Sequence, residues 1–457
     1  MSLSPTDWSI VIFYFVSVIT TGFIYSKKEN FNDKSDYILA GRKITLPLFV
    51  ATLVATWYGS ILGVGEFVYN SGITAWLTLG VPYYIAALLF AFILSGKIRT
   101  FGSTTIPEQF SNSYGRLAGV LASIIVLVIT IPAAYISMLG TLTSSLSGYD
   151  LIYTTIAATI ISFVYIYHGG FKSDVYANVL QLILMYLAFS FLIFFCISEL
   201  GSISLMMDNL PSYATNPLEK HSFQYLIVWY IIALQTFVDP SFHQRCAAAT
   251  SPKTAKNGII ISVLLWLVFD MLTLFTGLYA LAYIDISNPL DTYLVLGDTV
   301  LPNVVKGIFV AGLFATIMST LSSYGFLSAV TIGNDLIKPY FKNTKSSNDV
   351  KIGLIITAIV GISISLYVPS VIDIFYNTAS ISIPGLLFPL LISYSSKFTL
   401  RNNHALVIMI VSTILSGTWL LLKSFTDIVV FGKVEPMLIG LLVSFILSLF
   451  FVIKSKH

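Results

Sequence analysis

The chain has 457 residues, of which 56% are hydrophobic and only 10% are charged, and its mean hydropathy is +0.87. This composition is typical of a polytopic membrane protein, because a stretch of about 20 apolar residues crosses a bilayer as a helix. The net charge of +3 comes without a soluble basic domain, which argues against a nucleic-acid partner. The sequence also lacks a G-x-x-x-x-G-K-[ST] phosphate loop and any zinc-type Cys/His spacing, which argues against ATP-driven transport and a zinc site.

Apolar segments follow one another along the whole chain and predict thirteen transmembrane helices. The first segment has no basic leader and no small-residue cleavage site, so we expect it to be retained in the mature protein. No connection exceeds about 25 residues, and residues 1–457 are therefore expected to form a single transmembrane domain. The expected spans lie at about 7–26, 46–71, 74–97, 117–146, 150–168, 174–199, 222–239, 257–284, 303–331, 349–368, 370–394, 403–423 and 434–453.

Basic residues are distributed unequally between the two sets of connections. Twenty lysines and arginines fall on one side and four fall on the other, which accounts for all 24. On the side with twenty, Arg245 and Asp335 are assigned to helix ends. Short loops rich in basic residues stay in the cytoplasm, so we predict an external N-terminus and a cytoplasmic C-terminus. The minority set is Lys220, Lys306, Lys423 and Lys433.

Ten of the thirteen spans can be divided into two groups of five, at about 46–199 and 222–394, when the spans 7–26, 403–423 and 434–453 are set aside. Because five is odd, the second group enters the membrane from the opposite side. This arithmetic predicts an inverted repeat, in which ion and solute sites lie near the bilayer midplane beside the broken first helix of each group.

The second span contains the clearest candidate for such a break, within LVATWYGSILGVGEF from Leu53 to Phe67. Gly59, Gly63 and Gly65 each lower helix stability by about 1 kcal/mol relative to alanine. An unwound turn here frees backbone carbonyls that could bind a cation. The alternative is that these glycines only allow neighbouring helices to approach closely.

The span at 303–331 carries hydroxyl groups at helical spacing, on Thr316, Ser319, Thr320 and Ser323. These residues lie on one face of a helix, where hydrocarbon offers their oxygens no solvent. One interpretation is that this face binds a desolvated cation. The other is that the hydroxyls bond back to the preceding helical turn.

Several motifs together resemble the sodium/solute symporters, a family that includes sugar, proline, pantothenate, sialic acid and choline carriers. The likeness runs over most of the chain. It implies the inverted-repeat fold of the leucine-transporter type, with one additional helix before the ten-helix core and two after it. The motifs are ATWYGSILGVGEFVYNSG in the second span, TIPEQF with a following YG at 105–115, GGFKSDVYANVLQ at 169–181, DPSFHQRCAAA at 239–249 and GLFATIMSTLSSYGFLSAVTIGND at 312–335.

The resemblance also implies a principal sodium site between the first and eighth core helices. Carried onto matching positions, its ligands are three backbone carbonyls and two hydroxyls. Neutral oxygens suit a monovalent ion, whereas a divalent ion normally requires carboxylates. The expected ligands are the carbonyls of Leu53, Thr56 and Thr316 and the hydroxyls of Ser319 and Thr320.

The chain departs from the family pattern at its second cation site. Carriers with a second sodium ion have an aspartate in a T-D-x-x-Q segment, where this chain reads ANVLQ with Asn178. The matching hydroxyls of Ser322 and Ser323 are present, and Asp174 lies one helical turn before Asn178 and could replace the missing acid. We therefore predict one sodium ion per cycle, with Asp270 and the Asp174 group as alternative second-cation or proton sites.

The family's solute site lies beside the broken first helix and faces the third, sixth and tenth core helices. Aromatic residues there could hold an amine by cation–π attraction, although most rings in such a chain serve packing or interface contacts. No lysine or arginine is expected in the middle of a span, which favours an amine-bearing, zwitterionic or neutral polar solute and disfavours a sugar. The candidates are Trp57, Tyr58, Ser60, Tyr135, Gln235, Thr236 and Tyr376.

These features predict a sodium-coupled importer that works by alternating access as a monomer in a cell membrane, most simply a bacterial inner membrane. Sodium is expected to be the co-transported ion. The alternatives are a proton-coupled carrier of the same fold, which would use Asp270 or Asp174, and a membrane sensor without transport. An enzyme is not expected, because no nucleophile has a recognisable base.

Overall fold

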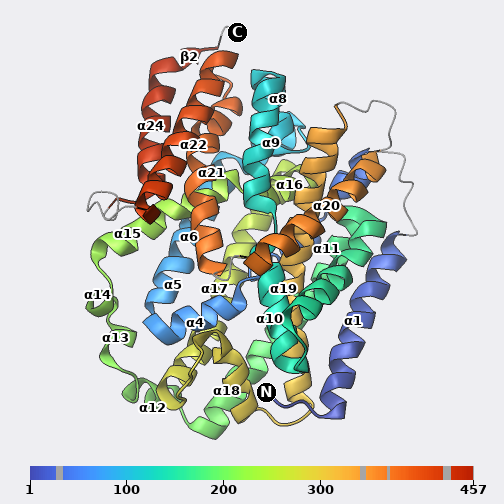
Figure 1. Cartoon of the computed structure of the whole chain (residues 1–457), viewed down its shortest axis with the longest axis vertical. Coiled ribbons are helices and arrows are strands. Elements are labelled where there is room, and N and C mark those ends of the chain that lie inside the picture. Colours follow the sequence, from blue (N-terminus) through green and yellow to red (C-terminus); the bar gives the residue numbers. More distant parts are fainter. Residues whose placement is uncertain (27–33, 340–345, 368–370, 426–433, 456–457) are drawn as a thin grey trace.

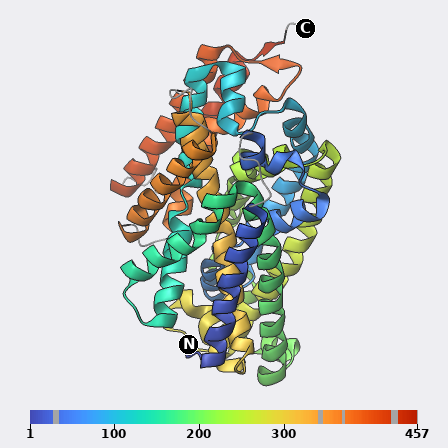
Figure 2. The ribbon, with the colours of Figure 1, turned by 90° about the vertical axis from the view of Figure 1, so that its right-hand side faces the viewer.

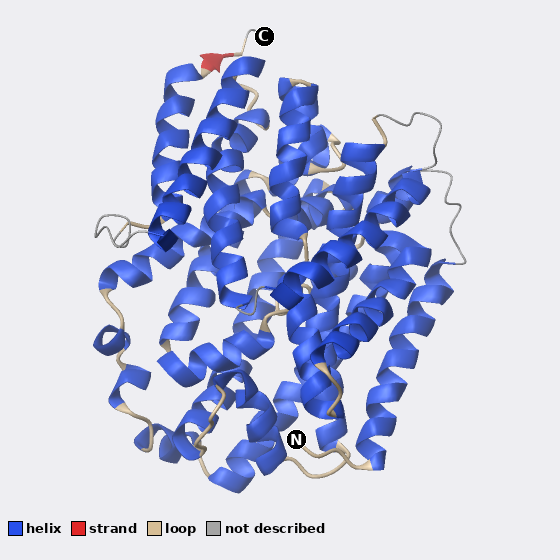
Figure 3. Cartoon of the chain, in the orientation of Figure 1, coloured by secondary structure: helices blue, strands red, loops and turns tan. Residues whose placement is uncertain are grey.

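The computed structural model describes residues 1–26, 34–339, 346–367, 371–425 and 434–455 (Figure 1). The described residues are almost entirely helical, and most of the long helices run along the same axis (Figure 3). The two termini lie at opposite ends of the molecule in both orientations (Figures 1 and 2). This placement agrees with an odd number of crossings.

The described part of the first half contains eleven α-helices. They are α1 (Pro5–Ser26), α2 (Lys34–Leu39), α3 (Leu46–Ala55), α4 (Ile61–Ser71), α5 (Thr74–Leu79), α6 (Val81–Ile93), α7 (Ser95–Phe101), α8 (Ile106–Tyr114), α9 (Arg116–Thr130), α10 (Ala133–Ser147) and α11 (Leu151–Leu200). A 3₁₀ turn, η1 (Ala40–Arg42), precedes α3.

The second half continues in the same way. It contains α12 (Ile203–Asp208), α13 (Ser212–Thr215), α14 (Pro217–Lys220), α15 (Phe223–Ile232), η2 (Ala233–Val238), α16 (Pro240–Ala248), α17 (Pro252–Tyr283), η3 (Pro289–Asp291), α18 (Thr292–Val300), α19 (Val305–Val330), the π-helical η4 (Thr331–Ile337), α20 (Ser346–Tyr367), α21 (Val371–Ser393), α22 (Asn402–Phe425) and α24 (Pro436–Phe451). Two short strands, β1 (Phe398–Thr399) and β2 (Ile453–Lys454), pair antiparallel near the C-terminus.

Within the described ranges, eight helices are long and apolar enough to cross a membrane, and one bent pair of helices could be a ninth span. The predicted number of thirteen is therefore not confirmed. One reason is that the expected spans 150–168 and 174–199 fall in the single 50-residue helix α11, which would be about 75 Å long if straight. Gly170, with φ 58° and ψ −150°, interrupts α11 between them.

Helix α19 lies at the centre of the molecule, and almost every residue from Gly307 to Val330 is buried. Small residues let its neighbours approach closely. A Cβ added at Gly312 would lie 2.2 Å from the Cβ of Ala188 in α11, and one added at Gly325 would lie 2.4 Å from the Phe163 ring. Helices α1 and α11 cover one side of α19 (Figure 2). The hydroxyl face of α19 is thus held inside the protein, away from lipid.

The helical path breaks twice near this core. The first break separates α3 from α4 at residues 56–60, inside the expected span 46–71. The second lies at Asp239, where the segment Phe223–Val238, formed by α15 and η2, meets α16 at 41°. Asp239 caps α16 by accepting a hydrogen bond from the Ser241 amide at 2.7 Å, and Pro240 begins the helix. The expected break in the second span is confirmed.

Candidate functional site

The break after α3 brings its last carbonyls against α19. Gly59 makes this approach sterically feasible, because a Cβ there would lie 2.5 Å from the Thr320 Cβ and 2.6 Å from the Tyr135 ring. Gly63 and Gly65 lie further along, in α4, where Gly65 fits against the ring of Tyr293. Of the three glycines, Gly59 is therefore the one that joins the broken helix to the hydroxyl face.

Two hydroxyls of α19 reach across this junction. Ser319 Oγ donates to the Ala55 carbonyl at 2.7 Å, and Thr320 Oγ1 donates to the Thr56 carbonyl at 2.9 Å. Ser319 and Thr320 are fully buried. The carbonyl that accepts from Ser319 is that of Ala55, two residues beyond Leu53. The assignment of the Leu53 carbonyl as a sodium ligand stays a prediction.

Thr316 behaves differently from these two residues. Its hydroxyl donates back to the Gly312 carbonyl at 2.7 Å, which is the structural role that was weighed against cation binding. The Thr316 carbonyl, which is the group expected to bind sodium, accepts from Ser319 Oγ at 2.9 Å. The carbonyls of Ala55, Thr56 and Thr316 and the hydroxyls of Ser319 and Thr320 are therefore joined by direct hydrogen bonds.

This group consists entirely of neutral oxygens. Carbonyl and hydroxyl oxygens are hard ligands that suit a small monovalent cation in a dry interior. Among the described residues, no group of three or more His, Cys, Asp or Glu side chains gathers in a way that could hold a metal ion. The chemistry of the group favours sodium as a transported ion over a resident divalent metal.

A second polar cluster surrounds Asp174 in α11. Ser322 Oγ donates to Asp174 Oδ1 at 2.6 Å, and Ser323 Oγ donates to Asp174 Oδ2 at 2.5 Å. Asn178 Nδ2 donates to Thr52 Oγ1 at 2.8 Å and lies 3.3 Å from Asp174 Oδ2. The structure thus brings together four of the five expected second-site residues, while the fifth, Asp270, lies elsewhere.

Arg245 enters the same cluster, which the sequence analysis did not predict. We expected Arg245 at a cytoplasmic helix end and no basic residue within the spans. It lies in the last turn of α16, which is a helix end, but its side chain is completely buried and its Nη2 lies 4.0 Å from Asp174 Oδ2.

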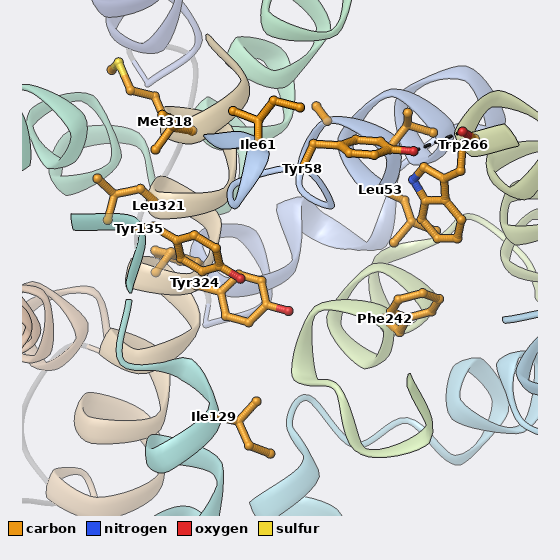
Figure 4. Close-up of a cluster of buried hydrophobic side chains, with 14 of the residues drawn as sticks. Leu53, Tyr58, Ile61, Ile129, Tyr135, Phe242, Trp266, Met318, Leu321 and Tyr324 are labelled. Carbon is orange, nitrogen blue, oxygen red and sulfur yellow. Dashed lines mark hydrogen bonds between the residues drawn. The ribbon is translucent and has the colours of Figure 1, made fainter. Parts of the chain in front are cut away.

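The solute candidates fall into two groups (Figure 4). Tyr135 lies beside Tyr324, with ring centroids 5.5 Å apart, next to Gly59. Tyr58 points the other way, toward Trp266, and donates to its carbonyl at 3.0 Å. Trp57 is half-buried, with its ring centroid 4.9 Å from that of Trp266. Tyr58 and Tyr135 thus point away from each other in Figure 4.

The remaining solute candidates are polar. Ser60 precedes α4 without a side-chain capping bond. Gln235 and Thr236 lie in η2, immediately before the second break, and the buried Thr236 hydroxyl has no hydrogen-bond partner among the described residues. Tyr376 lies in α21, and its side chain is outside the described part of the structure.

Asp270 in α17 belongs to the Tyr58 group. Its Oδ1 accepts from Tyr58 at 2.8 Å, and its Oδ2 accepts from Tyr84 in α6. Asp270 and Asp174 have different hydrogen-bond partners, so the two acids belong to separate clusters. Tyr84 was missed by the sequence analysis, because nothing in its local pattern separates it from the other aromatic residues.

A model of the sodium:solute symporter family matches residues 37–380, which is more than half of the chain. The chain belongs to the sodium:solute symporter family. Similar members include the human sodium-coupled monocarboxylate transporter 1, 25% identical over 371 residues, which cover 74% of this chain and 60% of that transporter. A sodium/proline symporter of Staphylococcus aureus (strain NCTC 8325 / PS 47) is 24% identical over 391 residues, covering 78% of this chain and 74% of the symporter.

Solved structures of symporters share the fold. A Na⁺-coupled sialic acid symporter in a substrate-bound outward-open state matches with a TM-score of 0.82 and 16% identity, over 99% of both chains. The nucleobase-cation-symport-1 family transporter MHP1, in a closed conformation with bromovinylhydantoin bound, matches with a TM-score of 0.61 and 14% identity, covering 92% of this chain and 95% of that one. The expected multi-pass transporter fold of the leucine-transporter type is confirmed.

Two further contacts of this symporter were not predicted. Asp239, at the second break, accepts from the hydroxyl of Tyr324 at 2.7 Å and so joins α16 to α19. Thr52, one turn before the first break, accepts from both Asn178 and Arg245. The D-P dipeptide signals the helix start at Asp239, whereas the partner of each side chain depends on how the helices pack.

Proposed function

We propose that this symporter carries a small polar organic solute into the cell by alternating access, driven by the inward sodium gradient, with one sodium ion per cycle. The observation that carries the proposal is the pair of hydrogen bonds from Ser319 and Thr320 to the carbonyls of Ala55 and Thr56. They join a broken helix to an intact one through oxygens that can also bind a monovalent cation.

Sodium acts at this junction by replacing the direct hydrogen bonds. A hydroxyl that donates to a carbonyl directs its hydrogen toward the place an ion would take, so binding requires both hydroxyls to rotate and present lone pairs. The ion then links α19 to the end of α3 and organises the neighbouring turn at Trp57 and Tyr58. By linkage, a solute that prefers this arrangement raises the affinity for sodium by the same factor.

The solute site lies at the two breaks, beside Trp57, Tyr135 and Thr236. The Thr236 hydroxyl is a buried polar group without a described partner, and such groups are costly to leave unpaired. A solute with a polar head and an apolar body meets both this hydroxyl and the rings. We favour an amine-bearing, zwitterionic or neutral polar solute, and the proline and monocarboxylate carriers among the relatives define further compounds to test.

Uptake into proteoliposomes tests the function. The purified protein is reconstituted and supplied with radiolabelled proline, choline, lactate or sialic acid, with sodium outside and potassium inside. Accumulation of one compound above equilibrium, abolished when potassium replaces external sodium, supports the proposal. Uptake that is equal in both salts contradicts sodium coupling.

A proton-coupled carrier remains the second candidate, and one observation favours it. Asp270 is a partly buried carboxyl group held by the hydroxyls of Tyr58 and Tyr84, and intramembrane acids of this kind commonly serve proton relays. In that case, the same liposomes would accumulate solute in response to an inwardly directed proton gradient without sodium. A requirement for sodium at every pH excludes this candidate.

A further inference from the structure

One end of the Arg245 guanidinium is surrounded by oxygens from three helices. Its Nη2 lies 3.0 Å from Thr52 Oγ1 and 2.7 Å from Thr56 Oγ1, at the end of α3. It also lies 3.0 Å from Ser323 Oγ in α19 and 4.0 Å from Asp174 Oδ2 in α11. A single nitrogen atom thus contacts four oxygens, which together form an oxygen cage on its outer side.

Two of these hydroxyls use their own hydrogens elsewhere. Thr56 donates to the Thr52 carbonyl at 2.5 Å, and Ser323 donates to Asp174 Oδ2 at 2.5 Å. Each therefore presents only lone pairs to the guanidinium. Hydroxyl ligands face a bound metal cation with the same orientation, so the cage is arranged to receive positive charge.

Asp174 supplies the negative charge of this cage. It is fully buried, and two serine hydroxyls hold its two oxygens in place. A carboxylate in such an interior needs a nearby counter-charge. Arg245 is the basic group that the described part of the structure places within 4.0 Å of it. On its other side, the guanidinium lies 5.6 Å from the centre of the Phe171 ring.

The cage contains residues that the family pattern assigns to a second cation, with the acid moved from position 178 to Asp174. We propose that Arg245 is a built-in cation that takes the place of a second sodium ion in this chain. The inference deepens the proposed function, since it explains a transport cycle with one sodium ion. Thr56 belongs to both places, because its side chain accepts from Arg245 while its carbonyl accepts from Thr320.

Removal of the guanidinium leaves an anionic set of oxygens that a sodium ion can fill. The experiment counts sodium ions bound per purified protein, using radioactive sodium at equilibrium and mildly alkaline pH, where protons compete least. It compares wild type, Arg245→Ala, Arg245→Lys and the charge-neutral Arg245→Ala/Asp174→Asn. We expect Arg245→Ala to bind one more sodium ion than wild type. The other two variants should bind the same number as wild type.

An unchanged count in Arg245→Ala, or the same gain in the charge-neutral double variant, would overturn the assignment. Sodium should also restore the thermal stability of Arg245→Ala. If this variant does not fold in high sodium while the double variant does, the assignment is overturned as well. A wild-type protein that already binds two sodium ions would also overturn the assignment. A wild type that binds none contradicts the proposed function, whereas the difference between Arg245→Ala and wild type tests Arg245 alone.

Discussion

Thr320 donates its hydroxyl to the carbonyl of Thr56 at 2.9 Å, and Gly59 lies against the same threonine side chain. The same junction thus provides both the close packing of the broken helix against α19 and the oxygens of the candidate sodium site. Substitutions there should change packing and ion binding together. Substitutions far from both cation clusters should change only stability.

Gly59→Ala should abolish sodium-specific stabilisation. Its Cβ would lie 2.5 Å from that of Thr320, and overpacking of this kind costs about 1–3 kcal/mol. The matched control is Gly417→Ala in α22, where an added Cβ meets no atom within 4 Å. Thermal unfolding in sodium and in potassium measures both effects, and an undiminished sodium response in Gly59→Ala would show that the junction does not bind the ion.

Asp7→Ala should lower stability without affecting sodium binding. Asp7 Oδ1 accepts from the amides of Val304 at 2.7 Å and Gly307 at 3.0 Å, at the start of α19. Loss of such a helix cap costs about 0.5–2 kcal/mol. Because Ser319 lies twelve residues beyond Gly307, or about 18 Å along the helix, the difference in melting temperature between sodium and potassium should be retained. Its disappearance would mean that the two ends of α19 are coupled.

Asp270→Asn should preserve the sodium response. Asp270 makes its described hydrogen bonds with Tyr58 and Tyr84 and none with the α19 hydroxyls. The amide keeps the size of the carboxyl group and an oxygen acceptor, while it removes the titrating proton. Solute uptake is measured against pH in wild type and variant. Sodium-driven uptake in Asp270→Asn supports sodium coupling. Complete loss of accumulation at every pH in this variant supports the proton-coupled alternative.

The predicted orientation is tested by cysteine labelling. Asp150 and Ser396 are exposed and lie on opposite predicted faces, and the native Cys196 and Cys246 are buried and unpaired. In intact cells, an impermeant maleimide should label Asp150→Cys and should reach Ser396→Cys only after permeabilisation. The reverse pattern would show an internal N-terminus.

Local periodicity was sufficient to predict the hydroxyl face of α19, because Ser319 and Thr320 lie on one helical surface wherever that helix packs. The break near Gly59 was also predictable from a cluster of residues that disfavour helix. Which carbonyls of the α3 end bind the ion stays a prediction, because it depends on where α3 ends, and helix ends are the least predictable feature of a sequence.

The position of Arg245 could not be predicted in this way. A polar stretch such as SFHQR follows an apolar segment and therefore resembles a loop, whereas the structure turns at Asp239 and continues as the buried helix α16. The partner of Arg245 depends on a second irregularity, the interruption of α11 at Gly170, which sets the position of Asp174. Two breaks, distant in sequence, together determine this ion pair.

Thermal stability of the purified protein in sodium and in equal potassium, for wild type and Ser319→Ala, tests the central claim most directly. A ligand that binds only the native state must raise its stability, by about 2.7 kcal/mol at a hundred times its dissociation constant. We predict a sodium-specific rise in wild type that Ser319→Ala abolishes. An equal rise in both proteins would contradict the assignment of sodium to this site, and no rise in wild type would contradict sodium coupling itself.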